Sequence, residues 1–189
     1  MTLDHDIQKA VGVLKTGGVI LYPTDTIWGI GCDATNMKAA ERIYRIKERM
    51  GERSMIILVS DLEMLEQYVS DVPEIARELI SGMDEPLTVI YPGARNLPKN
   101  VLAKDNSIAI RIPRHDFCQA MIRSLNKPIT STSANLSGGP NPFTFSGIAD
   151  AIKESVDYIA PARYQSISRL KPSTIVRIDP DGEMHIVRN

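Results

Sequence analysis

The sequence contains little cysteine, few aromatic residues and no long apolar run. Its two cysteines, Cys32 and Cys118, stand far apart and belong to no Cys-x-x-Cys or Cys/His pattern, which argues against a disulfide framework and against a zinc site. No run approaches the length of a membrane-spanning helix, and the first residues lack the basic start and apolar stretch of a signal peptide. We therefore expect reduced thiols, a cytoplasmic location and no membrane partner.

An excess of charge of one sign is also lacking. The 22 Lys and Arg residues nearly balance the 23 Asp and Glu residues, which leaves a formal net charge of -1 at pH 7. This balance gives no reason to expect nonspecific adhesion to nucleic acid or to an anionic membrane, so any phosphate binding must be local. The sequence has no Walker loop and no Gly-x-Ser-x-Gly, and its three histidines lack the spacing of a catalytic triad or a metal site.

The apolar patterns predict one α/β domain that spans residues 1–189. Helical periodicity and short apolar runs alternate along the chain, and several of the strands are apolar on both faces, which favours a twisted sheet flanked by helices. The last two strands read as a hairpin, so we expect a mixed sheet. The predicted helices cover 7–14, 36–50, 62–69, 73–80, 116–125 and 147–155, and the predicted strands cover 19–22, 54–60, 86–91, 107–113, 173–178 and 184–188. A further strand is expected to begin at 128 and to pass into a polar loop.

The densest basic stretch, residues 38–53, suggests a phosphate clamp. Its mixed charges are equally typical of a solvated helix face with i,i+4 ion pairs. We expect the helix to unwind at Gly51. If the chain is extended where it leaves the helix, Lys47 and Arg49 would lie on the same side of it. Together they could then hold one polyphosphate.

The strand at 107–113 places Ser107, Ala109 and Arg111 on one face, because successive strand residues alternate. A buried arginine needs a partner. One interpretation is a structural ion pair with an Asp or Glu, and the other is an anion receptor on the floor of a cleft, because an arginine can bind a carboxylate with two hydrogen bonds.

A hydroxyl-rich and glycine-rich loop, residues 131–139, follows the strand that begins at 128. It reads either as a generic polar loop or as an anion-binding concavity of backbone N–H groups and hydroxyls. Ser173 stands in a similar place, at the start of a late strand.

Five segments in order, "YPTDTIWGIGCDA", "KER", "IAIRIP", "STSANLSG" and "PSTIV", together resemble the YrdC-like family of threonylcarbamoyl-AMP synthases. The resemblance covers nearly the whole chain and includes the family's KxR and SxN signatures, here Lys47 with Arg49 and Ser133 with Asn135. It implies a twisted mixed β-sheet flanked by helices, with a concave, positively charged cavity. It also implies that L-threonine, bicarbonate (or CO2) and ATP combine to give threonylcarbamoyl-AMP and pyrophosphate.

The resemblance also implies roles for individual residues. Lys47 and Arg49 would be catalytic and hold the phosphates with Mg²⁺, without a metal ligand from the protein side chains. Partner proteins would then transfer the threonylcarbamoyl group to the adenosine beside the anticodon of tRNA. The implied ATP-binding residues are Lys47, Arg49, Ser107, Ser133, Asn135 and Asn141, and the implied threonine-binding residues are Thr24, Arg111, Ser131 and Ser173.

Some positions depart from the family's pattern or stay open. Met50 stands where the family commonly has proline and Asn141 where many members have serine. Trp28 stands where a tyrosine is usual, and it either forms a wall of the ligand pocket or fills the core. The alternative function is a double-stranded RNA-binding module without catalysis, because relatives have been linked to such RNA, and a third is a nucleotide-sensing domain. Against an RNA partner, the chain is slightly acidic and lacks an aromatic-rich RNA signature.

Overall fold

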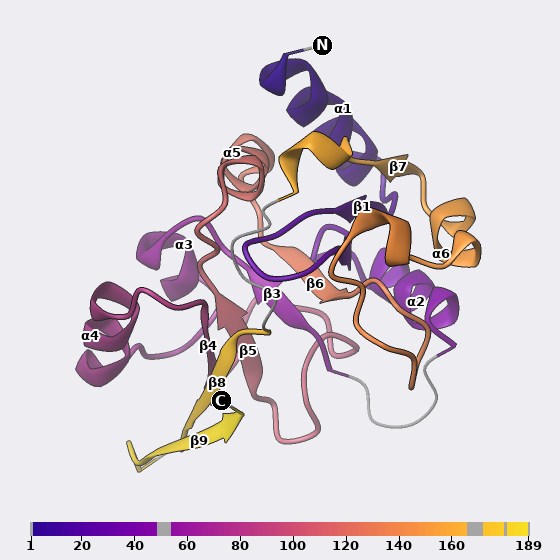
Figure 1. Cartoon of the computed structure of the whole chain (residues 1–189). Helices are drawn as coiled ribbons and strands as arrows, with labels where there is room; N and C mark the ends of the chain where they lie inside the picture. Colours follow the sequence, from indigo (N-terminus) through magenta and orange to yellow (C-terminus); the bar gives the residue numbers. More distant parts are fainter. Residues whose placement is uncertain (1, 49–53, 166–171, 180, 189) are drawn as a thin grey trace.

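The computed structural model describes residues 2–48, 54–165, 172–179 and 181–188. Within them, helices and strands alternate along the chain, and the strands form one mixed sheet in the order β7-β1-β2-β6-β3-β5-β4-β8-β9 (Figure 1). This confirms the predicted α/β architecture. The strands are β1 (Ile20–Tyr22), β2 (Gly29–Gly31), β3 (Ile56–Leu58), β4 (Leu87–Tyr91), β5 (Ile108–Arg111), β6 (Ile129–Ser133), β7 (Tyr158–Ile159), β8 (Thr174–Ile178) and β9 (Met184–Arg188).

Parallel and antiparallel pairs are mixed along the sheet. The pairs β1/β7, β3/β5 and β4/β8 are parallel, whereas β1/β2, β2/β6, β3/β6, β4/β5 and β8/β9 are antiparallel. The predicted hairpin of the last two strands is therefore confirmed. Strand β9 carries a bulge: Ile175 pairs with Arg188 and Val176 pairs with Ile186, so that Val187 has no counterpart on β8.

The sequence did not predict strands β2 and β7. Strand β2 has the sequence Gly-Ile-Gly, which has low β propensity, and it lies inside the segment expected to be a loop. A Cβ atom at Gly31 would lie 2.2 Å from the carbonyl oxygen of Thr130 and 2.8 Å from the ring of Tyr22. Glycine is therefore required there by the close approach of the neighbouring strand, which local propensity does not register.

The helices surround the sheet. Helix α1 packs along α5 at one end of the molecule, while α3 and α4 lie together and α2 and α6 lie together on opposite sides in Figure 1. Thr2 caps α1 and Asn36 caps α2, as their side-chain oxygens accept backbone N–H groups of the first turn. The bounds are α1 (Leu3–Lys15), α2 (Met37–Ile46), α3 (Leu62–Glu66), α4 (Glu74–Gly82), α5 (Asp116–Leu125) and α6 (Asp150–Ser155), with short 3-10 turns at Phe145–Gly147 and Ala162–Tyr164.

Helix α2 is shorter than predicted. It ends at Ile46 with Lys47 as its C-cap, and Glu48 has a positive φ of 52°, which breaks the helical path well before Gly51. The prediction that Gly51 ends this helix was therefore wrong. Met50 and Gly51 lie outside the described residues.

The burial of Trp28 decides between its two interpretations, a wall of the ligand pocket and a residue of the core. Its side chain is 1% exposed and packs on Phe145, with 5.2 Å between ring centroids, and its indole N–H donates to Oε1 of Gln165 at 2.7 Å. Trp28 is thus a core residue.

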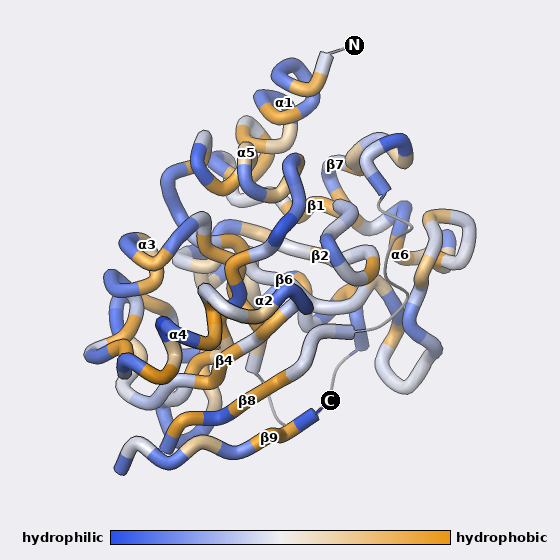
Figure 2. Tube along the Cα trace, turned by 60° about the vertical axis from the view of Figure 1, so that its left-hand side comes forward, coloured by the Kyte–Doolittle hydropathy of each residue, from blue (hydrophilic) through white to orange (hydrophobic). Residues whose placement is uncertain are grey.

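Hydrophobic residues concentrate along the strands, as the orange segments of β4 and β8 show in Figure 2. Cys32 and Cys118 are buried, free thiols. Among the described helices, none combines the length and apolar character needed to span a bilayer.

Candidate functional site

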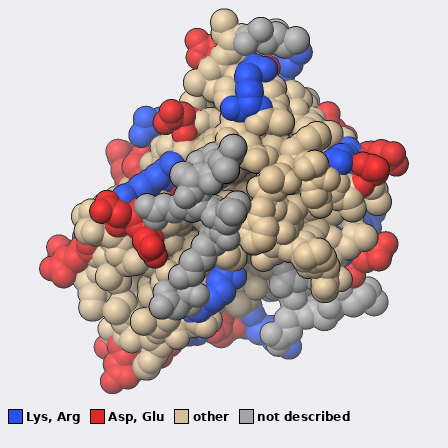
Figure 3. All heavy atoms as spheres, in the orientation of Figure 1, with Lys and Arg blue, Asp and Glu red and all other residues tan. Residues whose placement is uncertain are grey.

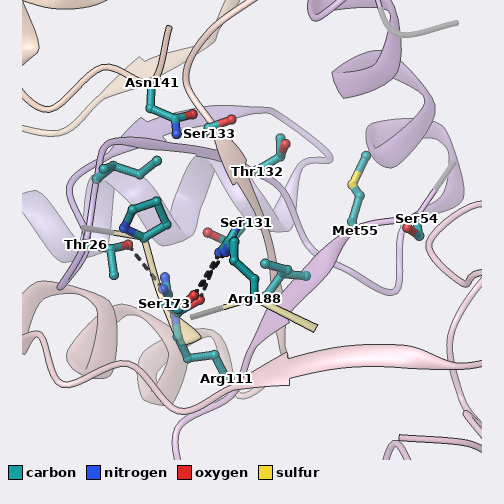
Figure 4. Close-up of a pocket in the computed structure, with 13 residues that line it drawn as sticks. Thr26, Ser54, Met55, Arg111, Ser131, Thr132, Ser133, Asn141, Ser173 and Arg188 are labelled. Atoms are coloured by element: carbon teal, nitrogen blue, oxygen red, sulfur yellow. Dashed lines mark hydrogen bonds between the residues drawn. The ribbon is translucent and has the colours of Figure 1, made fainter. Parts of the chain in front are cut away.

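A cavity of about 280 Å³ lies over the middle of the sheet. Its walls come from the loop after β1, from the chain leading into β3, from β5 and β6, and from the segments around β8 and β9, so residues far apart in sequence meet there (Figure 4). Among the polar residues of its lining, seven carry the argument below: Thr26, Arg111, Ser131, Ser133, Asn141, Ser173 and Arg188.

The strand register explains why these residues share one face. Ile56 of β3 pairs with Ala109 of β5 on one side and with Ser131 of β6 on the other, and Leu58 pairs with Arg111. Paired residues point to the same face of a sheet. The predicted common face of Ala109 and Arg111 is therefore confirmed, and Ser131 lies on it.

The ion-pair interpretation of Arg111 is confirmed, and the anion-receptor interpretation stays a prediction. It is 5% exposed and lines the cavity, and its Nη2 lies 3.5 Å from Oδ1 of Asp25, which is also buried. Its Nη1 donates to Oγ1 of Thr26 at 3.2 Å, and Oδ2 of Asp25 accepts the backbone N–H of Arg114 at 3.1 Å. Within the described residues, Nε of Arg111 and Oδ1 of Asp25 have no hydrogen-bond partner. The donors of Arg111 are therefore not all used by its partners within the protein.

Thr24 lies behind the cavity, whereas Thr26 lines it. The hydroxyl of Thr24 donates to the carbonyl oxygen of Ile27 at 2.8 Å and lies 3.0 Å from Oγ1 of Thr26, which in turn contacts Arg111. Sequence analysis missed Thr26, although it lies only two residues beyond Thr24 in the same segment. No periodicity marks which of two neighbouring threonines in a loop faces a ligand.

Arg188 was also missed, and the bulge in β9 explains its position. Ile175 and Ser173 share a face, and the unpaired Val187 places Arg188 opposite Ile175 rather than one residue further along. Arg188 donates from Nε and Nη2 to the carbonyl oxygen of Ser173, at 3.2 and 2.9 Å, and lines the cavity. Desolvation by burial, together with the nearby charge of Arg111, lowers the pKa of Arg188 below its usual value.

The side chain of Ser173 is almost fully buried. Its Oγ lies 2.8 Å from the hydroxyl of Thr88 on β4, and the residue lines the cavity. Figure 4 shows Ser173, Arg111 and Thr26 grouped around one end of the cavity. That end therefore presents two guanidinium groups and several hydroxyls.

Lys47 is buried and holds the SxN loop. Its ammonium donates to the backbone oxygen of Ser133, to the backbone oxygen of Asn135 at 2.7 Å and to Oδ1 of Asn135 at 3.2 Å. Lys47 is thus brought together with Ser133 and Asn135, the two residues of the second signature. An ammonium has three N–H donors, so a phosphate contact requires one of these bonds to be exchanged. Arg49, the other half of the KxR signature, lies outside the described residues.

The remaining nucleotide-binding candidates occupy different places. Ser133 and Asn141 line the cavity, as does the threonine candidate Ser131, whereas Asn135 lines a second cavity of about 430 Å³ on the side of α6. Ser107 is buried but does not line either cavity, and its hydroxyl donates to Oδ1 of Asp105 at 2.6 Å. The structure thus brings Ser133 and Asn141 to the first cavity but not Asn135 or Ser107.

Positive charge in the site comes from two arginines, the buried Arg111 and the exposed Arg188. On the face shown in Figure 3, Lys and Arg are scattered among Asp and Glu, and neither sign gathers into a large patch. Among the described residues, no group of three or more His, Cys, Asp or Glu side chains is placed to hold a metal ion. The arrangement suits recognition of anionic groups in a confined space, where charges act more strongly than at an exposed surface.

Comparisons with known proteins identify the family of the chain. The family model Sua5_yciO_yrdC, described as "Telomere recombination", matches residues 12–189. The chain belongs to this family. A threonylcarbamoyl-AMP synthase of Pseudoalteromonas translucida is 34% identical over 161 residues, which cover 84% of this chain and 86% of the relative. A threonylcarbamoyl-AMP synthase of Vibrio cholerae is 36% identical over 143 residues, which cover 74% and 76%.

Two solved members of the Sua5/YciO/YrdC family share the fold. The crystal structure of E. coli YciO matches with a TM-score of 0.84 and 29% identity, over 100% of this chain and 90% of that one. P. abyssi Sua5, crystallised in complex with L-threonine, matches with a TM-score of 0.84 and 26% identity. The match covers 96% of this chain but 53% of the Sua5 chain, so the protein corresponds to about half of that relative.

Proposed function

We propose that this protein is an L-threonylcarbamoyladenylate synthase, a nucleotidyltransferase that uses L-threonine, bicarbonate or CO2, and ATP. Relatives named threonylcarbamoyl-AMP synthase and the L-threonine complex of P. abyssi Sua5 support the assignment. The observation that carries it is the pair Arg111 and Arg188 in one hydroxyl-lined cavity, with Arg111 incompletely paired to Asp25. Two guanidinium groups in a confined site suit substrates with more than one anionic group.

The reaction needs alignment and charge rather than a protein nucleophile. The amine of threonine attacks the carbon of bicarbonate or CO2, an N–C bond forms, and water or a proton leaves to give a carbamate. A carbamate oxygen then attacks the α-phosphorus of ATP, and the bond to pyrophosphate breaks. Positioned cations favour both steps, because they hold the reactants in line and stabilise the negative charge that builds on the leaving group.

The proposed roles divide the site into two parts. Arg111 binds the threonine carboxylate, Ser131 and Ser173 line the amino-acid pocket, and Thr24 supports the pocket from behind through its contact with Thr26. The SxN loop, fixed by Lys47, lies on the nucleotide side. The proposed nucleotide residues are Lys47, Arg49, Ser133, Asn135 and Asn141, of which Lys47 and Arg49 would be catalytic. Ser107, which lines neither cavity, would contact the nucleotide only if its hydrogen bond to Asp105 were exchanged.

Mg²⁺ fits this site as a companion of ATP. It prefers oxygen ligands and is often held by substrate phosphates. Asp25, the acid beside the cavity, is already engaged by Arg111 and by the N–H of Arg114. The hydroxyls of Ser131 and Ser133 and the amide oxygen of Asn141 are the lining groups that suit its hydration shell. When bound, the ion would neutralise charge on the leaving pyrophosphate.

The product would feed tRNA modification. Transferase proteins would move the threonylcarbamoyl group to N6 of the adenosine beside the anticodon. The test mixes purified protein with ATP, Mg²⁺, L-threonine and bicarbonate, measures pyrophosphate, and seeks the adenylate by mass spectrometry while each substrate is omitted in turn. Pyrophosphate that requires both threonine and bicarbonate supports the proposal. RNA binding without any turnover would replace it by a binding function.

A further inference from the structure

The second cavity, of about 430 Å³, lies beside α6, and the proposed reaction assigns no ligand to it. Its volume falls within the range of about 300 to 1,000 Å³ that is typical of sites for small molecules, which combine apolar walls with a few polar groups. Leu136 and Pro140, which follow the SxN signature, and Ile148, which precedes α6, provide apolar walls. The cavity therefore suits a small molecule with an apolar body.

Lys153 supplies a cation to the lining of this cavity. Its side chain is only 21% exposed, and its ammonium lies 5.1 Å from the centre of the Phe145 ring and 3.0 Å from Oδ1 of Asp150. The aromatic ring attracts the ammonium through a cation–π contact, whereas the carboxylate of Asp150 is 85% exposed and compensates the charge weakly. An anionic group inside the cavity can therefore replace Asp150 as the partner of Lys153.

The two cavities share the chain that carries the SxN signature. Ser133 and Asn141 line the first cavity, whereas Asn135 and Gly139 line the second. The amide nitrogen of Asn135 donates to the carbonyl oxygen of Gly139 at 2.6 Å. Its amide oxygen accepts from the ammonium of Lys47 at 3.2 Å and from the hydroxyl of Ser133 at 2.5 Å. The side chain of Asn135 thus connects the wall of the second cavity to the proposed nucleotide site.

This network determines the sign of the coupling between the cavities. In the observed arrangement, the ammonium of Lys47 donates to three oxygen atoms of Ser133 and Asn135, so a phosphate contact requires one of these bonds to be exchanged. A molecule that packs against Leu136 and Pro140 stabilises the observed arrangement, because a ligand favours the state to which it binds better. It therefore opposes the exchange and weakens the binding of ATP.

We propose that the second cavity binds a small molecule that joins an anionic group, paired with Lys153, to an apolar body, and that this effector inhibits the synthase from outside its substrate site. The inhibition rests on the proposed synthase function, whereas the binding does not. Coupling between two binding sites is reciprocal. ATP must therefore weaken the effector by the same factor by which the effector weakens ATP.

Two fluorescent probes with the same rings test the binding. 1-Anilinonaphthalene-8-sulfonate carries an anionic sulfonate, and N-phenyl-1-naphthylamine lacks it. We expect Lys153→Met to raise the dissociation constant of the sulfonate probe about tenfold, the scale of a hydrogen bond to a charged group, and to leave that of the neutral probe within about threefold. Lys153→Arg, which keeps the charge, and the control Lys15→Met, at an exposed lysine in the last turn of α1, should stay within about threefold of the wild type for both probes.

Fluorescence titrations of the wild-type protein with ATP test the coupling. We expect ATP to raise the dissociation constant of the sulfonate probe to a plateau about fivefold higher, at the low end of allosteric coupling. Saturating probe should raise the dissociation constant of ATP by the same factor and slow pyrophosphate release.

Four results would overturn the proposal. They are a sulfonate probe that does not bind, equal effects of Lys153→Met on the two probes, displacement by ATP without a plateau, which would place the probe in the first cavity, and an active enzyme in which ATP leaves the probe unaffected. A protein that binds the sulfonate probe through Lys153 but makes no pyrophosphate would instead refute the proposed function and leave the second site in place.

Discussion

Nη2 of Arg111 lies 3.5 Å from Oδ1 of Asp25, and both side chains are almost completely buried. The distance is within ion-pair range but beyond a good hydrogen bond, and Oδ1 of Asp25 has no hydrogen-bond partner among the described residues. The aspartate therefore compensates the charge of the arginine without occupying all of its donors. A substrate carboxylate can bind Arg111 while Asp25 remains in place.

Loss of the Asp25 charge should destabilise the fold. Asp25→Asn keeps the shape of the side chain but leaves Arg111 as an uncompensated buried charge, and we expect the free energy of unfolding to fall by about 3 kcal/mol. Urea denaturation at pH 7 measures this. Asp150→Asn is the matched control, because Asp150 is 85% exposed in its ion pair with Lys153 and should contribute about 0–1 kcal/mol. Equal stability of the two variants would contradict the buried-pair assignment.

Lys47 should contribute to turnover because its ammonium holds the SxN loop in place. Lys47→Met keeps most of the apolar stem but leaves the oxygen atoms of Ser133 and Asn135 without their donor. We expect kcat to fall by about 10² to 10³, the range seen when one preorganised charge or donor is lost. Steady-state pyrophosphate release measures it, with Lys38→Met on the exposed face of the same helix as control. A variant with native melting and the turnover of the control would remove Lys47 from the machinery.

Most of the fold could be predicted from periodicity, because buried strands and amphipathic helices leave regular apolar patterns. The misses have specific causes. Strand β2 consists largely of glycine, and Thr130 and Tyr22 of the neighbouring strands approach it closely. This approach is a tertiary contact, so the local sequence of β2 does not reveal it. The end of α2 depends on the positive φ of Glu48, a residue type that gives no sign of it.

The residues of the candidate site could be predicted only in part, because some of them reach the cavity through tertiary contacts. Arg111 and Ser131 follow from strand alternation and from the resemblance. Arg188 reaches the cavity only because β9 bulges at Val187, and a bulge depends on the partner strand. Thr26 faces the cavity because its hydroxyl is held between Thr24 and Arg111, and that geometry is tertiary.

The bulge itself can be tested through Arg188. Deletion of Val187, the residue without a counterpart on β8, would make β9 regular and leave Arg188 opposite Ile175 on the same face. We expect kcat/KM of this deletion to stay within about threefold of the wild type, whereas Arg188→Gln should lower it by about 10 to 100-fold, the scale of a charged hydrogen bond. Arg123→Gln, at an exposed position of α5, is the control. A deletion that loses as much activity as Arg188→Gln would contradict the register in which Val187 is the extra residue.

The single tryptophan reports on the core. Trp28 is 1% exposed and its indole N–H is bound to Gln165, so its fluorescence should be blue-shifted and poorly quenched by acrylamide. Because Trp28 lines neither cavity, saturating L-threonine should leave the quenching constant unchanged. Urea-unfolded protein provides the fully accessible reference. Quenching of the folded protein near that reference would contradict the burial of Trp28.

Asp105 provides a pH test of the contact made by Ser107. Hydrogen bonds from the Ser107 hydroxyl, and next from Arg177, lower the pKa of Asp105 from 3.8 to about 2. A lowered pKa means that the folded state holds fewer protons than the unfolded state as the pH falls. The resulting stability is therefore present above about pH 4 and is lost as the pH falls through 2.

Carboxyl-detected NMR follows this titration directly. We expect the midpoint of Asp105 to lie near 2 in the wild type and to rise toward 3.8 in Ser107→Ala, which removes the largest contribution. Ser81→Ala, a serine whose hydroxyl donates to the carbonyl oxygen of Arg77, should leave the midpoint unchanged. A wild-type midpoint near 3.8 would mean that the hydroxyl of Ser107 is not held by Asp105. It would then be available to donate to a nucleotide, as the resemblance implied.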